Sequence, residues 1–364
     1  MAVTSPRHDL ALALATLSVP DATRRDVSAF WELARLEGVL PVAVQRLSAA
    51  MPVPPDVVRE ARDHEARALV DERDLRTVLD EFDRRHVRVL VIKGAALAHS
   101  LYERPGLRPR VDSDLLIARD DVERTHALFR DEGARYVPHV TGEYVMSQFH
   151  YVRTDRAGCE HAYDIHWRVV NPTPFASAFD FDVVWQRSRP LPALGATARG
   201  PSLPDALLIA CVHRAAHHAA EGPLLWLLDV YLLAESMSAE DRSAFLGSAR
   251  SGGLTAIASH ALLEAASFFR GSSAVSIAAE LREDADRTSE PTAAYLADRT
   301  RLQETVGDLR VLPWRARARF VRELAFPPAH YMRHVYAAGR PGPLPVLYAR
   351  RLLTGIVRWA RPRR

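Results

Sequence analysis

Apolar positions along the chain follow two different periods, and the change between them divides the sequence. In residues 9–85 apolar side chains recur near helical spacing, and the charged stretch 57–85 keeps its apolar residues on one side. From about residue 201 the pattern is helical again. The interval between holds short apolar or alternating runs that predict strands over 89–92, 110–117, 136–140, 144–153 and 162–170. This order of elements predicts an α+β fold.

Four segments follow from this pattern. We expect a helical N-terminal arm (1–86), a core with the strands (87–200), a helical C-terminal domain (201–340) and a basic amphipathic tail (341–364). A chain of 364 residues with 48% hydrophobic content can bury a sizeable core. Its net charge of +3 is too small to argue for nucleic acid without a clustered patch.

The expected compartment is the cytoplasm. The two cysteines, Cys159 and Cys211, imply neither a disulfide scaffold nor a cysteine-rich zinc site. The N-terminus has no basic segment followed by a long apolar run, and no stretch of about 18 apolar residues occurs.

The strand expected over 110–117 carries two acids, Asp112 and Asp114, among apolar residues. Side chains two apart share one face of a strand, about 6.6 Å apart at a rise of about 3.3 Å per residue. Such a pair can converge on one or two divalent cations, which favour carboxylate oxygens. The alternative is the polar, solvent-facing side of an amphipathic strand, although Asp is a poor strand former.

A Lys-Gly turn follows the strand 89–92. Gly94 permits a tight turn, and the first amides of the helix expected over 95–101 would face an anion such as phosphate. Lys93 is the one lysine in a chain with 48 basic residues. Since arginine is used at every other basic position, this lysine indicates a place where an ammonium fits and a planar guanidinium does not. The alternative is that the lysine is present by chance.

The segments KGAALAHSLY and PGLRPRVDSDLLI together resemble a bacterial nucleotidyltransferase family of the DNA-polymerase-beta-like superfamily. The resemblance covers roughly residues 25–235. It implies a small mixed sheet in which a strand-turn-helix holds a triphosphate, an Asp pair binds magnesium and a third carboxylate completes the site. By resemblance Asp112 and Asp114 bind the metal and Gly94 belongs to the phosphate turn. Many superfamily members have Ser where this chain has Ala95, so a hydroxyl contact to phosphate is missing.

Asp164 is the candidate for the third carboxylate, because it lies in a later strand about fifty residues beyond the pair. It would bind the second metal and accept the acceptor's proton, and it must then lie within about 8 Å of the pair for one two-metal cluster to be shared. The alternative is an acid on a surface strand. His166 shares the face of Asp164, and a hydrogen-bonded structural histidine is the simpler interpretation.

Other polar residues are weaker candidates. Arg108 lies in the segment that the resemblance covers, and we expect it to bind phosphate with Lys93, Gly94 and the Ala95 amide. His213 and His217 share a helix face, but the glutamate of a zinc-protease motif is absent, so pocket lining or polar core is the better interpretation. Trp226 and Asp229 could border the acceptor pocket, and for Trp226 the alternative is an ordinary core residue.

The C-terminal stretch from Leu309 concentrates arginine and aromatic residues. A basic amphipathic helix is expected over 346–359. Residues 344–364 could be a solvated tail, a contact to an anionic membrane, or a dock for a protein or RNA.

These observations favour a Mg²⁺-dependent (or Mn²⁺-dependent) nucleotidyltransferase that moves a nucleoside monophosphate from an NTP, with ATP expected, to an acceptor hydroxyl and releases pyrophosphate. The acceptor could be a small molecule, peptide, protein or RNA. One alternative is a non-catalytic nucleotide-binding accessory or regulatory protein whose phosphate turn is weakened at Ala95. A helical scaffold is another, but it has no need for all three acids.

Overall fold

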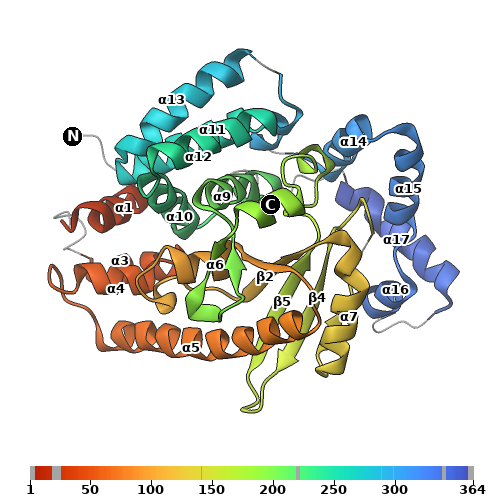
Figure 1. Cartoon of the computed structure of the whole chain (residues 1–364), viewed down its shortest axis with the longest axis horizontal. Helices are drawn as coiled ribbons and strands as arrows, with labels where there is room; N and C mark the ends of the chain where they lie inside the picture. Colours follow the sequence, from red (N-terminus) through yellow and green to blue (C-terminus); the bar gives the residue numbers. More distant parts are fainter. Residues whose placement is uncertain are drawn as a thin grey trace.

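The computed structural model describes residues 5–18, 26–140, 142–218, 222–287, 289–297, 299–337 and 342–359. A five-stranded mixed sheet lies between helical layers (Figure 1). Its strands are β1 (Val89–Ile92), β2 (Asp112–Ile117), β3 (Arg135–Val137), β4 (Gln148–Thr154) and β5 (Glu160–His166), in the order β1-β2-β5-β4-β3. Neighbouring strands are antiparallel except β2 and β5, which are parallel. The predicted α+β class is confirmed.

The helices before and between these strands are α1 (Pro6–Thr16), α3 (Val27–Leu36), α4 (Leu40–Leu47), α5 (Pro55–Arg84), α6 (Lys93–Ser100), α7 (Val122–Asp131) and α8 (Phe181–Arg187). A short ribbon, β6 (Arg189–Pro190) with β7 (Arg199–Gly200), precedes the second helical region. That region comprises α9 (Leu203–His218), α10 (Leu224–Glu235), α11 (Ala239–Ser251), α12 (Thr255–Phe269), α13 (Ser272–Arg287), α14 (Arg301–Val311), α15 (Trp314–Ala325), α16 (Ala329–Tyr336) and α17 (Leu344–Trp359).

The two faces of the sheet border different hydrophobic cores because strand side chains alternate. In β1, Leu90 and Ile92 join the core shared by the N-terminal helices and α9–α13. Val89 and Val91 join the core on the opposite face, which α5 and α7 cover. Since the same alternation continues in β2 and β5, one face of each strand is left for polar side chains.

Buried hydrogen bonds hold α5 against the second face. The hydroxyl of Tyr163 on β5 donates to Asp74 of α5 at 2.6 Å, and His161 pairs with Asp71 at 2.9 Å. Because residues 161 and 163 point toward α5, the alternate residues 164 and 166 must point to the other side of the sheet.

Observed boundaries differ from the expected ones by a few residues. The helix after the Lys-Gly turn begins at Lys93 rather than at residue 95, and the last strand ends at His166 rather than at residue 170. The basic C-terminal helix is present as α17, whereas residues 341 and 360–364 of the predicted tail lie outside the described part of the chain. Among the described helices none has both the length and the hydropathy needed to span a bilayer.

Candidate functional site

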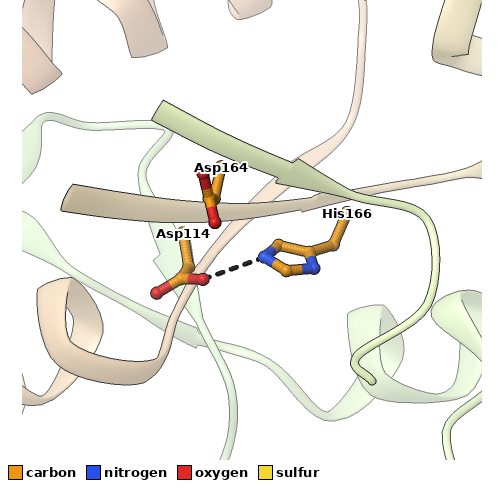
Figure 2. A group of neighbouring side chains, drawn as sticks. All are labelled: Asp114, Asp164 and His166. Atoms are coloured by element: carbon orange, nitrogen blue, oxygen red, sulfur yellow. Dashed lines mark hydrogen bonds and ion pairs between the residues drawn. The ribbon is translucent and has the colours of Figure 1, made fainter. Parts of the chain in front are cut away.

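Asp114 and Asp164 lie side by side on the two parallel strands of the sheet (Figure 2). They are register partners across β2 and β5, and His166 follows two residues later on the same face of β5. One ligand atom from each of these three side chains lies within 4.8 Å of the others. The expected proximity of the third carboxylate to the pair therefore holds for Asp114. Asp112 does not join this group, although it lines the same cavity.

Two hydrogen-bond donors converge on one oxygen of Asp114. The Lys93 ammonium donates to Oδ1 at 2.7 Å, and Nε2 of His166 lies 2.8 Å from the same oxygen. Burial by itself would raise the pKa of Asp114, but Lys93 and His166 hold it well below its usual value. Burial, together with the Lys93 charge, lowers the pKa of His166. The arrangement thus pairs an ionised Asp114 with a neutral His166 that donates through Nε2.

Asp112 has a different electrostatic environment. Burial and the negative charges of Asp114 and Asp164 raise its pKa to about 6, although Lys93 and His150 oppose the shift. A carboxylate oxygen of Asp164 lies close to Nδ1 of His150 on β4, a contact that is an ion pair only when the imidazole is protonated. A divalent cation bound between carboxylates on adjacent strands would reduce the repulsion between their negative charges.

The Lys-Gly turn has its unusual conformation at the lysine. Lys93 has a φ of 51°, in the left-handed region that few residues other than glycine adopt. Gly94 meets a different requirement, since a Cβ atom there would collide with the Arg108 guanidinium. The side chain of Ala95 is 1% exposed and packs in the core under α5, so it presents no group to the cavity.

Arg108 reaches the site from the loop before β2. Its Nη2 donates to Asp229 of α10 at 2.7 Å, and the hydroxyl of Tyr102 donates to the other oxygen of Asp229 at 2.7 Å. Asp229 and Tyr102 raise the pKa of Arg108 against the lowering effect of burial. The residue expected to hold phosphate is therefore also the link between the active-site loop and the C-terminal helices.

A cavity of about 600 Å³ contains these groups. Six of the seven residues expected to hold phosphate or metal line it: Lys93, Gly94, Arg108, Asp112, Asp114 and Asp164. Ala95 is the exception. Its other wall is largely apolar and comes from α9 and α10, including Ile209, Leu225 and Trp226. A volume of this size is in the range of small-molecule sites.

Of the two histidines expected to share a face of α9, His213 is seen at this cavity. His213 lines it and makes an edge-to-face contact with Trp226 at 5.2 Å between ring centroids, which agrees with pocket lining. The side chain of His217 lies outside the described residues.

The sequence interpretation missed two partners. His150 was not singled out, and no local motif marks it. Asp229 was noted, but its pairing with Arg108 was not; a lone acid in the apolar run of α10 was the available signal, because a buried charge needs a partner.

The donor set fits a divalent cation. Oxygen atoms of Asp114 and Asp164 lie together in the lining of the cavity, and Mg²⁺ in such sites takes one or two carboxylates together with substrate phosphates and water. His166 Nε2 is occupied by Asp114, so His166 orients a carboxylate rather than adding a ligand.

The mixed sheet, its acidic cluster and the helical flanks define a nucleotidyltransferase-type protein. A family model described as "Uncharacterised nucleotidyltransferase" matches residues 23–270, well over half of the chain. The chain belongs to this nucleotidyltransferase family. No curated protein matches it.

Proposed function

We propose that this protein is a Mg²⁺-dependent nucleotidyltransferase that transfers a nucleoside monophosphate from an NTP, with ATP as the expected donor, to an acceptor hydroxyl. The supporting observation is the juxtaposition of Asp114 and Asp164 on parallel strands in the lining of a 600 Å³ cavity. We also propose that the family is bacterial and belongs to the polymerase-beta-like superfamily. The support is the resemblance of the Lys-Gly turn (residues 93–94) and the Asp-Ser-Asp segment (residues 112–114) to that superfamily.

Asp112, Asp114 and Asp164 would hold the metal, which neutralises charge on the triphosphate and activates the attacking oxygen. Lys93 and His166 keep Asp114 ionised and oriented. Asp164 accepts the proton of the acceptor hydroxyl while a bond forms from that oxygen to the α-phosphorus. The bond from this phosphorus to the β-phosphate oxygen breaks, and pyrophosphate leaves with its electron pair.

The apolar wall of α9 and α10 has the chemistry for a nucleobase or a hydrophobic acceptor, and the guanidinium of Arg108, paired with Asp229, lines the same cavity. Several acceptor classes remain compatible with the cavity: a small molecule, a peptide, a protein segment or an RNA end.

Calorimetry with ATP, GTP, CTP and UTP, with and without Mg²⁺, tests the site. We expect metal-dependent binding of a nucleotide that Asp164→Asn abolishes. Asp120→Asn is the matched control because Asp120 is an exposed acid just beyond β2 and lies outside the cavity. Equal binding by the wild type and Asp164→Asn would refute the proposed metal site.

A second assay tests the alternative that the protein binds nucleotide without catalysing transfer. The missing hydroxyl at Ala95 is the observation that favours this alternative. Labelled NTP is incubated with candidate acceptors, and both label transfer and pyrophosphate are measured. Metal-dependent binding with no pyrophosphate release across the acceptor classes would support the binder and refute the transferase.

A further inference from the structure

The C-terminal region has a charge opposite to that of the rest of the chain. Residues 301–364 contain 14 arginines and three acidic residues, a net charge of +11. Because the whole chain has a net charge of +3, residues 1–300 carry −8. This region also lies beyond residue 270, where the match to the nucleotidyltransferase family ends. Such an asymmetry is typical of a segment that binds an anionic surface.

Helices α14–α17 carry many exposed apolar side chains and few buried ones. They gather at one side of the molecule (Figure 1, blue), where Glu323 of α15 contacts Tyr144 in the segment before β4. These helices share a small core with Tyr144 and Val145, which precede β4. Its buried residues are Leu312, Ala316 and Phe320. Ten of the exposed large hydrophobic side chains in the described part of the chain lie here: Leu302, Val306, Val311, Trp314, Val321, Phe326, Val335, Val346, Leu352 and Leu353. Exposed apolar side chains gathered on neighbouring helices are typical of an interaction site.

Helix α15 presents an apolar stripe on its outer face. Its buried residues, Ala316 and Phe320, define the inner face. Positions 314, 318, 321 and 325 follow at helical spacing on the opposite side, and Trp314 is 73% exposed there.

Arginines flank this stripe on both sides. At 100° per residue, Arg315 and Arg322 lie along one border of the stripe and Arg317 along the other. Among the described residues Arg315 and Arg322 form no ion pair. Arg319 lies closer to the inner face of α15 and pairs with Glu143 and Glu323. The inner arginine contributes to packing, and Arg317 donates to the Leu312 carbonyl at 2.9 Å, so Arg315 and Arg322 are the border arginines left for an external partner.

Helix α17 has the same design. Leu347 faces inward and is 1% exposed, while Val346, Ala349 and Leu353 are exposed on the outer side at i, i+3 and i+7. Leu353 is 71% exposed. Arg351 reaches back to α15, where it donates to the Leu324 carbonyl, so α17 is fixed to α15 by its inner face.

We propose that α14–α17 dock the enzyme on the surface of an anionic lipid bilayer. A helix with an outward apolar stripe bordered by arginines can lie in the membrane interface, with its apolar side chains among the acyl chains and its guanidiniums at the lipid phosphates. Nucleic acid is the poorer partner, because exposed leucines and valines have no role at a phosphodiester backbone. A second copy docked through the same face would bring two arginine-rich helices, such as α15 of each copy, against one another.

The docking unit is attached to the polypeptide that leads into the active site. Glu323 of α15 accepts a hydrogen bond from the Tyr144 amide at 2.9 Å, and Arg319 pairs with Glu143 at 2.7 Å. Residues 143 and 144 lie just before β4, whose first residue, Gln148, lines the 600 Å³ cavity. The unit is thereby held in a defined position relative to the site.

Flotation of the full-length protein with lipid vesicles tests the proposal. We expect binding to phosphatidylcholine vesicles that contain about 30% phosphatidylglycerol, weaker binding as salt rises, and little binding to phosphatidylcholine alone. A triple variant, Arg315→Gln, Arg317→Gln and Arg322→Gln, should bind at least about tenfold more weakly. A second variant, Trp314→Ser with Leu353→Ser, should lose binding at high salt, where the apolar contacts dominate.

Matched controls alter the same chemistry elsewhere on the surface. Leu36→Ser and Leu69→Ser replace side chains that are 71% and 64% exposed on α3 and α5. Arg124→Gln replaces an exposed arginine on α7. These variants should bind vesicles like the wild type, and thermal melting of every variant reports whether it is folded.

Three outcomes would overturn the proposal. One is equal binding to anionic and neutral vesicles, or to neither. Another is tighter binding to an RNA oligonucleotide than to anionic vesicles, lost in the arginine variant. The third is self-association of the wild type that Trp314→Ser and Leu353→Ser abolish, without vesicle binding.

Discussion

Replacing Asp229 with alanine leaves the guanidinium of Arg108 buried without its carboxylate. The side chains of Arg108 and Asp229 are 9% and 3% exposed, and their atoms meet at 2.7 Å. Removing one partner of a buried ion pair costs about 3–5 kcal/mol, because the remaining charge stays desolvated. Tyr102 also loses the acceptor for its hydroxyl. We therefore expect Asp229→Ala to lower the free energy of unfolding by an amount near the upper end of that range.

Urea unfolding followed by circular dichroism measures this loss, and a double-mutant cycle isolates the pair. Arg108→Met should also destabilise the protein, because Asp229 is then the unpaired buried charge. The double variant should be less destabilised than the sum of the two by at least about 2 kcal/mol, since no lone charge remains.

An exposed ion pair provides the control. Arg85 and Asp131 meet at 2.9 Å with side chains 30% and 62% exposed, so Asp131→Ala should cost less than about 1 kcal/mol. The reasoning is refuted if Asp229→Ala costs no more than this control, or if the effects of Asp229→Ala and Arg108→Met are additive.

Three further outcomes are expected. Gly94→Ala should destabilise the protein by about 1–3 kcal/mol in thermal melting, because the new methyl group displaces the Arg108 guanidinium; an unchanged midpoint would contradict that contact. Tyr163→Phe should cost about 1–3 kcal/mol in urea unfolding, because a buried carboxylate of α5 loses its 2.6 Å donor, and a neutral effect would show that water replaces it. Burial raises the pKa of Cys211 to about 12, so iodoacetamide at pH 8 should label Cys159 alone in the folded protein and both thiols in urea; mass spectrometry that finds Cys211 labelled first would be contrary.

The α+β class was predictable because periodicity is local. Period 2 and period 3.6 can be read from short windows, and they separated the strands from the helices on both sides. Strand ends were less certain: the alternation in 162–170 continues past His166, where the chain leaves the sheet. Pairing order is a tertiary property, so the parallel contact of β2 with β5 could be inferred only through the resemblance.

The proximity of Asp114 to Asp164 followed from the same resemblance, whereas the partners of each charge did not. No spacing rule joins Lys93 to Asp114, 21 residues apart, or Arg108 to Asp229, 121 residues apart. The phosphate role expected for Lys93 and Arg108 remains a prediction. In the structure each of their cations is matched to a carboxylate, because a buried charge is stable only with a counter-charge.

The balance of charge at the site gives the single lysine a definite role. Asp112, Asp114 and Asp164 together carry three negative charges when ionised, and the Lys93 ammonium cancels one of them at Asp114. With the neighbouring imidazoles left out of this count, the two charges that remain match one divalent cation before any triphosphate binds. Burial, and after it the charges of Asp114 and Asp164, raise the pKa of Asp112 to about 6 even with Lys93 opposing the shift. A lysine held in a left-handed turn by the surrounding fold therefore sets the site to attract a cation of charge two while keeping Asp114 ionised.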